Sequence, residues 1–268
     1  MPELPEIITI RNNLRDEVLG KRILDIISYR KYPLKPSRAY FDKHALNRAI
    51  DNVFNIGKML VLELSSGYFI VIHLKMTGNL LLNKQDPYVR ITLKLDKNTS
   101  LNFSTVRLFE YFALWDKQKI ENYKKTIGKT PIESDLSFKQ FRSIFEKTST
   151  AIKTALLDQK RIAGLGNIYV NEALFLAKIN PKRPSNSLSQ QEFLLLFKKI
   201  ESVLLMGIKN HGSSFNRYKD LYGRSGSQQK FFYVYGKKDK LCIHCGTSSI
   251  FYEKIHGRGT FYCPKCQI

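Results

Sequence analysis

The four cysteines of the chain form two Cys-x2-Cys pairs near its end, Cys242 with Cys245 and Cys263 with Cys266. Two such pairs at this separation are typical of a site where four thiolates surround one zinc ion as a tetrahedron. A disulfide framework would instead spread its cysteines over a short secreted chain. Four thiolates leave no open position on the metal, so we predict one structural Zn²⁺ ion per chain.

The segment between the two pairs could contact phosphate groups. His256–Phe261 is predicted to be a turn with Arg258 at its tip, and residues 236–268 carry six Lys or Arg against two acids. Long cations on a turn commonly bind the sugar-phosphate backbone of nucleic acids. Zinc ribbons also bind proteins, so this segment alone leaves both kinds of partner open.

The first residues could supply a nucleophile. The small residue after Met1 allows removal of the initiator, and Pro2 would then carry a secondary α-amine beside Glu3 and Glu6. An α-amine titrates near about pH 7.7–8.0, so part of it is unprotonated at neutral pH and can form an imine with a substrate. The alternative is an ordinary first helical turn, where proline and acids are favoured by backbone geometry and the helix dipole.

A third candidate site is the run Gly164–Tyr169, which leads into the apolar stretch Val170–Ala177. Asn167 is a suitable N-cap for the helix predicted there. Free amides at a helix start bind phosphate, and Lys153, Lys160 and Arg161 supply positive charge nearby. The alternative is a glycine-terminated helical hairpin, which these residues alone favour.

These candidates need helices and strands to position them. Apolar residues three and four positions apart predict a helix over residues 3–19 that ends at Gly20. Between about residue 50 and residue 115, short β-rich segments indicate an antiparallel sandwich or barrel. The clearest are Met59–Leu64, Tyr68–Leu74, Asn79–Leu82, Val89–Leu95 and Ser100–Phe103. A linker over Gly128–Ser137 and a helical region follow, and the composition changes again after Gly236.

Charge and composition limit the class of protein. The chain has 268 residues and a net charge of +21, from 44 Lys and Arg against 23 Asp and Glu. This excess indicates a polyanionic partner, with nucleic acid the first candidate, although a uniformly basic proteome would have the same effect. Residues 1–6 lack the layout of a signal peptide, and no apolar run approaches the roughly 18 residues that span a bilayer. We therefore expect a cytoplasmic protein.

Together, these motifs resemble formamidopyrimidine-DNA glycosylases from end to end of the chain. The matching segments are Met1–Glu6, Gly57-Lys58, His73–Gly78, Gly164–Tyr169 and Thr260–Gln267. The resemblance implies an α+β multidomain fold in a bacterial, nucleoid-associated protein that acts as a monomer on duplex DNA. Its expected domains are an N-terminal β-sandwich with the catalytic helix (1–127), a helix-two-turns-helix domain (136–235) and a zinc-finger hairpin (236–268).

The resemblance also implies a chemistry. In the family, the processed N-terminal proline attacks C1′ of the damaged nucleotide, displaces the base and forms a Schiff base, a role that falls to Pro2. Glu3 would be the acid that helps to open the sugar ring, with Glu6 in support. Lys58 corresponds to the family's hairpin lysine at the phosphates and damaged base. The expected enzyme is a bifunctional glycosylase and abasic-site lyase that removes oxidised purines by β,δ-elimination in base excision repair.

Further residues match the family's DNA contacts. Because the damaged base must leave the stack, the gap needs fillers. Met76 and Phe109 correspond to wedges and Arg107 to the residue that holds the orphaned cytosine, although core packing is the alternative for Met76 and Phe109. The expected phosphate contacts around the flipped nucleotide are Lys153, Asn167, Tyr235 and Arg258, with Arg258 counted in the catalytic set.

Two segments depart from the family pattern. Where members usually carry Asp-Pro-Arg-Arg-Phe-Gly before a tryptophan, this chain has Thr105–Glu110 and a displaced Trp115. The expected lesion-covering loop, Tyr222–Gln229, has Arg224 where a lysine is common. These departures leave the opposite-base preference and lesion range open.

Two alternative functions remain open on the sequence. Leu4 favours the oxidised-purine branch over endonuclease VIII-like enzymes for oxidised pyrimidines, which usually begin Met-Pro-Glu-Gly-Pro. A non-catalytic protein that binds damaged DNA is the alternative from another class. The presence together of Pro2, Glu3, Glu6 and Lys58 argues against it, because binding alone needs none of that set.

Overall fold

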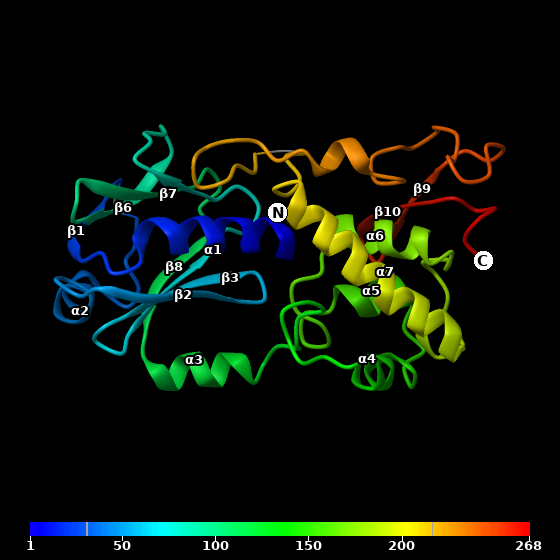
Figure 1. The fold of residues 1–268 in the computed structure, drawn as a ribbon, viewed down its shortest axis with the longest axis horizontal. Helices are drawn as coiled ribbons and strands as arrows, with labels where there is room; N and C mark the ends of the chain where they lie inside the picture. The colour runs from blue at the N-terminus through cyan, green and yellow to red at the C-terminus, as the bar shows by residue number, and fades with distance from the viewer. Residues whose placement is uncertain (31, 216) are drawn as a thin grey trace. The chain divides into compact units, whose positions relative to one another are not determined.

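The structure is a computed structural model that describes residues 1–30, 32–215 and 217–268 (Figure 1). The chain divides into two compact units. The first comprises residues 1–126 together with 208–229, and the second comprises residues 127–207 together with 230–268. The predicted domain boundaries remain a prediction. In the part of the chain that the structure describes, no helix has the length and apolar character that a membrane crossing requires.

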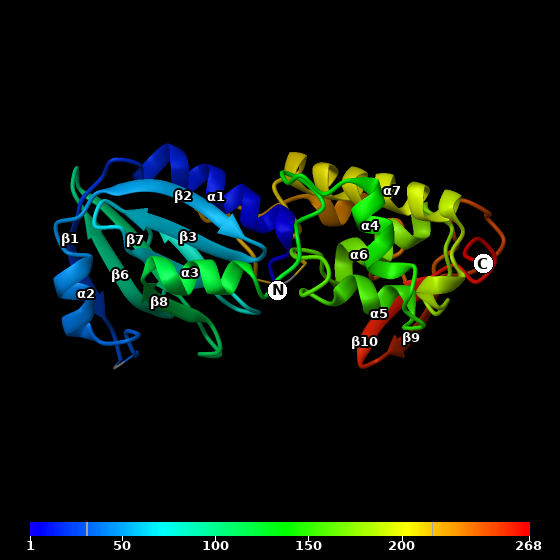
Figure 2. The ribbon, with the colours of Figure 1, turned by 90° about the horizontal axis from the view of Figure 1, so that it is seen from below.

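The first unit is a sandwich of two antiparallel four-stranded sheets (Figure 2). One sheet has the order β1-β6-β7-β5, with β1 Ile23–Ser28, β6 Val89–Leu95, β7 Thr99–Ser104 and β5 Asn79–Leu82. The other has the order β2-β3-β4-β8, with β2 Ile50–Ile56, β3 Met59–Leu64, β4 Phe69–His73 and β8 Tyr111–Trp115. The expected β-sandwich is confirmed. Strands β1, β2 and β8 were not predicted: polar residues interrupt the apolar alternation in β1 and β2, whereas β8 is an apolar run of only five residues.

Apolar side chains from both sheets meet inside the sandwich. Phe103 of β7 and Phe112 of β8 belong to different sheets, yet their ring centroids lie 5.5 Å apart. Phe41, from helix α2 (Arg38–His44), stacks on Phe112 with ring centroids 6.0 Å apart. Each of these rings is 1% exposed or less. The aromatic cluster therefore fixes the distance between the sheets, because close-packed cores adapt poorly to a change of volume.

Helix α1 (Leu4–Val18) opens the chain and packs on β2 and β3 (Figure 2). Its buried apolar residues include Ile7, Ile10 and Leu14, at the three- and four-residue spacing predicted from the sequence. Its first turn is a capping box, in which the backbone N–H of Glu3 donates to the Glu6 carboxylate at 2.8 Å. Helix α3 (Lys117–Lys124) follows the last strand of the sandwich.

The second unit is helical and ends in a two-stranded hairpin (Figure 1). Its elements are α4 Phe138–Phe145, α5 Ile152–Leu157, α6 Asn167–Leu176, η1 Ser185–Ser187, α7 Gln190–Lys209, η2 Gln228–Phe231, β9 Phe251–Ile255 and β10 Arg258–Tyr262. Residues 208–209 of α7 and 228–229 of η2 are counted with the first unit. The predicted linker over 128–137 contains no helix or strand. Asn167 was wrongly predicted as an N-cap, because Gly166 holds that position and Asn167 is the first helical residue.

Removing one ring from the sandwich core should destabilise the first unit. We predict that Phe103→Ala lowers the free energy of unfolding by about 3–5 kcal/mol, since it leaves a cavity between Tyr32 and Phe112. Urea denaturation followed by the fluorescence of Trp115, the only tryptophan in the chain, measures the loss. Leu24→Ala is the control because Leu24 is 53% exposed. Equal losses in the two variants would contradict this account of the core.

Candidate functional site

The expected nucleophile lies at the buried start of helix α1. Pro2 is buried, whereas Met1 is 45% exposed. With Met1 in place, the nitrogen of Pro2 is a peptide nitrogen, and removal of Met1 would turn it into a secondary amine. Glu3 is 3% exposed and Glu6 is 2% exposed, so the structure places both carboxylates in a desolvated region next to Pro2.

Glu6 fixes the start of the helix to a distant part of the chain. One carboxylate oxygen accepts the N–H of Glu3 at 2.8 Å, and the other accepts the N–H of Ser213 at 2.7 Å. Gly212 has φ +79°, and a Cβ there would lie 2.7 Å from Cγ of Glu6. Glycine is therefore required at 212 by both conformation and space. This geometry gives Glu6 a structural part, and its supporting role in the chemistry remains a prediction.

Lys58 lies in the two-residue turn that joins β2 to β3. Gly57 supplies the positive φ of 56° that such a tight turn requires. Arg11 of α1 donates to Asn55 at 2.9 Å, and the Asn55 amide donates to the carbonyl of Gly57 at 3.0 Å. This chain of hydrogen bonds positions the Lys58 turn relative to α1. Lys58 is only 8% exposed, in keeping with a lysine that serves a site rather than the surface.

His73, at the end of β4, is a functional candidate that the sequence analysis named only as part of a motif. Burial, reinforced by the charges of Lys75 and Lys58, lowers its pKa to about 3. Its Nδ1 accepts the N–H of Lys75 at 3.1 Å, so the neutral ring carries its proton on Nε2. His73 is thus a neutral donor beside two lysines. The signal in the sequence was a histidine at the end of an apolar strand, followed closely by a cation.

The three expected gap-filling residues lie together on two neighbouring loops. Met76 is 56% exposed, Phe109 is 72% exposed, and Arg107 is also exposed. The Arg107 guanidinium lies 3.6 Å from the sulfur of Met76, and the N–H of Arg107 donates to the Thr77 hydroxyl at 3.2 Å. Core packing is therefore wrong as an explanation of Met76 and Phe109. Large apolar side chains held in solvent at loop tips are typical of a binding surface.

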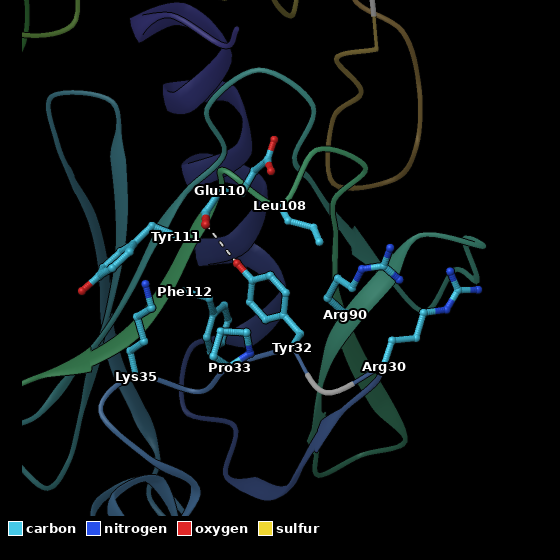
Figure 3. Close-up of a pocket in the computed structure, with 9 residues that line it drawn as sticks. All are labelled: Arg30, Tyr32, Pro33, Lys35, Arg90, Leu108, Glu110, Tyr111 and Phe112. Atoms are coloured by element: carbon cyan, nitrogen blue, oxygen red, sulfur yellow. Dashed lines mark hydrogen bonds between the residues drawn. The ribbon is translucent and has the colours of Figure 1, made fainter.

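A cavity of about 500 Å³ lies next to the loop that carries Arg107 and Phe109 (Figure 3). It is lined by Arg30, Tyr32, Pro33, Lys35, Arg90, Leu108, Glu110, Tyr111 and Phe112. None of the predicted catalytic residues lines it. In Figure 3 the Arg30 and Arg90 side chains lie on one side of Tyr32 and Lys35 on the other, so these cations do not converge on a single point.

Arg224 lies in the segment 208–229 of the first unit. Its guanidinium pairs with Asp220 at 2.8 Å and lies 4.6 Å from the centroid of the Tyr222 ring. The backbone N–H of Arg224 also donates to Asp220 at 2.8 Å. The start of the expected lesion-covering loop is therefore tied to Asp220, which precedes it, while the Arg224 side chain stays 64% exposed.

In the second unit, Lys153 and Asn167 both hold the C-terminal hairpin. The fully buried Lys153 amine donates to the carbonyl of Gly259 at 2.8 Å and to the hydroxyl of Thr260 at 2.7 Å. The amide of Asn167 donates to the same Gly259 carbonyl at 2.9 Å. The exposed Arg258 immediately precedes this anchored strand residue. The geometry gives Lys153 and Asn167 a structural part, and their contact with phosphate remains a prediction.

Tyr235 is positioned by a residue that the sequence analysis missed. Glu172 of α6 is 2% exposed and accepts the backbone N–H groups of Tyr233, Val234 and Tyr235 at 2.7, 3.0 and 2.8 Å. Burial raises the pKa of Glu172, and the hydrogen bonds from these three amides oppose that rise. The ring of Tyr235 packs 5.1 Å from that of Phe261. The signal for Glu172 in the sequence was an acid that lies among mainly apolar residues of the predicted helix.

The four cysteine sulfurs form a compact cluster. All four lie within 4.8 Å of one another, with 3.7 Å between those of Cys242 and Cys266 and 3.9 Å between those of Cys245 and Cys263. Four sulfur ligands at these separations fit a single tetrahedral metal ion. The cysteines pack with Phe175 of α6, Val234 and Ile250, so the four sulfurs belong to an apolar cluster of the second unit.

Comparisons with known proteins identify a family for both units. The family model of the formamidopyrimidine-DNA glycosylase N-terminal domain matches residues 1–112, and that of the glycosylase H2TH domain matches residues 127–219. The formamidopyrimidine-DNA glycosylase of Streptococcus mutans is 36% identical over 273 residues, which cover 100% of this chain and 99% of the relative. That of Herpetosiphon aurantiacus is 34% identical over 273 residues, which cover 100% of both.

Solved structures agree with these relatives. The complex between the Lactococcus lactis Fpg and an abasic site containing DNA is 34% identical, with a TM-score of 0.91 over 99% of each chain. The MutM (Fpg) protein from Thermus thermophilus is 31% identical, with a TM-score of 0.89 over 99% of this chain and 98% of that one. The likeness therefore extends over both units and the C-terminal hairpin.

The lowered pKa of His73 predicts a pH-dependent stability. The unfolded chain binds a proton at His73 below its ordinary pKa of 6.5, whereas the folded chain does so only near 3. Stability from this group is complete above pH 6.5 and is lost as the pH falls from there toward 3. We expect His73→Gln to lose less stability than the parent between about pH 7.5 and about pH 5 in urea denaturation. Protonation of His73 near pH 6 in an NMR titration would contradict the prediction.

Proposed function

This chain belongs to the formamidopyrimidine-DNA glycosylase family, and we propose from that premise that it excises oxidised purines from duplex DNA and cuts the strand at the resulting abasic site. The observation that carries the proposal is the buried start of α1, where Pro2 lies between an exposed Met1 and the buried Glu3. The Lactococcus lactis relative forms a complex with DNA that contains an abasic site. The preference for oxidised purines over oxidised pyrimidines is proposed and does not follow from family membership alone.

The proposed nucleophile is the amine of Pro2 after removal of Met1. Its lone pair attacks C1′ of the damaged nucleotide, the bond from C1′ to the base breaks, and the base leaves with the electron pair and a proton. Protonation of the ring oxygen breaks its bond to C1′ and gives an iminium ion, the cationic Schiff base, between Pro2 and the opened sugar. Elimination of the 3′ and then the 5′ phosphate cuts the strand on both sides. A free α-amine suits this work because part of it is unprotonated at neutral pH, unlike a lysine with its ordinary pKa.

Acid and base groups surround the proposed reaction. Glu3 is proposed to supply the proton to the ring oxygen as the sugar opens, since a buried carboxyl next to the amine can exchange protons with it. Lys58 is proposed to approach the phosphate and the damaged base from its turn between β2 and β3. The neutral His73 beside Lys58 supplies a hydrogen-bond donor without adding a charge that would compete for the same phosphate.

DNA binding is proposed to use separate groups for the gap and for the backbone. Met76 and Phe109 fill the space that the extruded nucleotide leaves, and Arg107 holds the orphaned base. The exposure of all three supports this assignment. Backbone contacts are proposed for Lys153, Asn167, Arg224, Tyr235 and Arg258, with Arg258 near the reacting nucleotide.

We infer that the four-thiolate site binds zinc and that the ion shapes the hairpin that carries Arg258. Sulfur ligation in a closed tetrahedron favours zinc, and the ion would supply folding energy to a small module. We further propose that the protein acts in the bacterial cytoplasm at the nucleoid. We propose that residues 1–127 form the catalytic domain, residues 136–235 the helix-two-turns-helix DNA-binding domain, and residues 236–268 the zinc-finger hairpin.

The nucleophile can be tested by borohydride trapping on duplex DNA with a single 8-oxoguanine. The processed protein should form a stable covalent adduct, whereas a variant that retains Met1 should bind the same DNA without trapping. Glu3→Gln should bind but lose about 100-fold or more of base excision, because the shape of the side chain remains and its proton is lost. Glu201→Gln, an exposed acid on α7, should excise like the parent.

Two outcomes would count against the proposed nucleophile. Trapping by the Met1-retaining variant at the rate of the processed protein would place the reactive amine elsewhere, with Lys58 as the next candidate. Efficient excision of thymine glycol with little excision of 8-oxoguanine would move the enzyme to the endonuclease VIII-like branch. An absence of trapping and excision on either lesion would support a non-catalytic binding protein.

The metal can be tested through the cysteines. We expect one zinc ion per chain by atomic absorption, and its loss together with at least about tenfold weaker DNA binding in Cys263→Ser. The fluorescence unfolding of Trp115, in the first unit, should not change. Ile243→Ser, at a position that is 60% exposed between two of the cysteines, is the matched control and should keep both zinc and affinity. Full DNA affinity in a zinc-free Cys263→Ser protein would refute a role for the metal in binding.

A further inference from the structure

Glu110 joins the two loops that carry the gap-filling residues. One oxygen of its carboxylate accepts the backbone N–H of Thr77 at 2.9 Å and the hydroxyl of the same residue at 2.7 Å. The other oxygen accepts the hydroxyl of Thr105. Glu110 is 5% exposed and Thr105 is fully buried. A carboxylate inside the protein thus takes donors from both the turn around Met76 and the start of the loop 105–110.

The backbone of Glu110 is held from the opposite side. The hydroxyl of Tyr32 donates to its carbonyl at 2.9 Å, and Figure 3 shows the carboxylate directed away from Tyr32. Burial, and then the charge of Glu110, raises the pKa of Tyr32 to about 12, so that hydroxyl keeps its proton. At Gly78, an added Cβ would lie 2.8 Å from Cγ of Glu110 and 2.7 Å from the carbonyl oxygen of Leu74. The turn therefore closes directly on Glu110.

The carboxylate also fixes the direction in which the hydroxyls of Thr77 and Thr105 donate their hydrogen bonds. Because it can only accept, the hydrogens of Thr77 and Thr105 both point to it. Their oxygens are then available to backbone amides of the loop 105–110: Thr77 accepts from Arg107 across the two loops, and Thr105 accepts from Leu108 within its own loop, each at 3.2 Å. Leu108 has φ +60°, a conformation that a non-glycine residue adopts only when its surroundings hold it.

The side chains beyond this network have little packing of their own. Phe109 is 72% exposed and Met76 is 56% exposed, so the directions in which they project are set mainly by the backbone to which they are attached. An aromatic wedge that must enter a base stack gains affinity when its direction is fixed beforehand, since less freedom is lost on binding.

We propose that Glu110 is a positioning residue that holds Met76, Arg107 and Phe109 as one preformed unit for insertion into DNA. This inference rests on the proposed function. Hydrogen bonds from Thr105 and Thr77 outweigh the effect of burial and lower the pKa of Glu110, so the carboxylate stays ionised through the neutral range. The network is accordingly intact wherever the enzyme works.

The test compares Glu110→Ala and Glu110→Gln with the parent on a duplex that has one 8-oxoguanine opposite cytosine and 2-aminopurine beside it. Glu110→Ala should slow single-turnover excision by about 10- to 100-fold and abolish the rise of 2-aminopurine fluorescence that reports unstacking. Glu110→Gln should fall between, because its oxygen still serves Thr77 while its amide reverses the bond to Thr105. Glu121→Gln, an exposed acid on α3, should match the parent.

Two further readouts separate positioning from damage to the protein. Affinity for an undamaged duplex, and borohydride trapping on a single-stranded abasic site where no base leaves a stack, should stay within about twofold of the parent. Parental excision and fluorescence in Glu110→Ala would overturn the inference, as would equal loss of trapping and excision in both variants. Failure of the parent itself to trap would instead refute the proposed function.

Discussion

The N-terminal turn of this chain depends on one buried carboxylate, Glu6, which accepts two backbone N–H groups that lie far apart in the sequence. An N terminus frays unless something holds it, and a nucleophile that frays cannot meet a substrate in a fixed direction. The bond to the N–H of Glu3 sets the first turn of α1. The bond to the N–H of Ser213 ties that turn to the segment that follows helix α7. Gly212 allows the approach.

The same device recurs at two other places. Glu172 collects three consecutive amides before Tyr235, and Glu110 collects an amide and two hydroxyls between the gap-filling loops. In each case the acid is at most 5% exposed and accepts backbone or hydroxyl donors. Three internal acids thus fix the geometry of a helix start and of two loop regions.

Much of the fold and the chemistry could be predicted from local patterns, and the rest could not. Helix α1, the cysteine cluster and the exposure of Met76 follow from spacing and turn residues, which act over a few positions. Strands β1 and β2 were not predicted because their polar residues are tolerated by the sandwich only after the sheets pair, and β8 is an apolar run too short to show a period. Asn167 was assigned to a cap, yet its amide is used by Gly259, a partner 92 residues away that no local rule can supply.

Helix α6 organises the C-terminal part of the second unit. Asn167 and Asn171 each hold a strand residue of the hairpin, Glu172 holds the stretch before Tyr235, and Phe175 packs with the cysteine cluster. The backbone around Arg258 and Tyr235 is thus positioned by successive turns of one helix instead of by flexible connections. In the proposed role of these two residues as phosphate contacts, the distance between their phosphates would be set before DNA binds. A regular duplex that does not match this spacing would then have to bend or unstack to make both contacts, so mechanical compliance of the DNA itself would become a criterion of recognition.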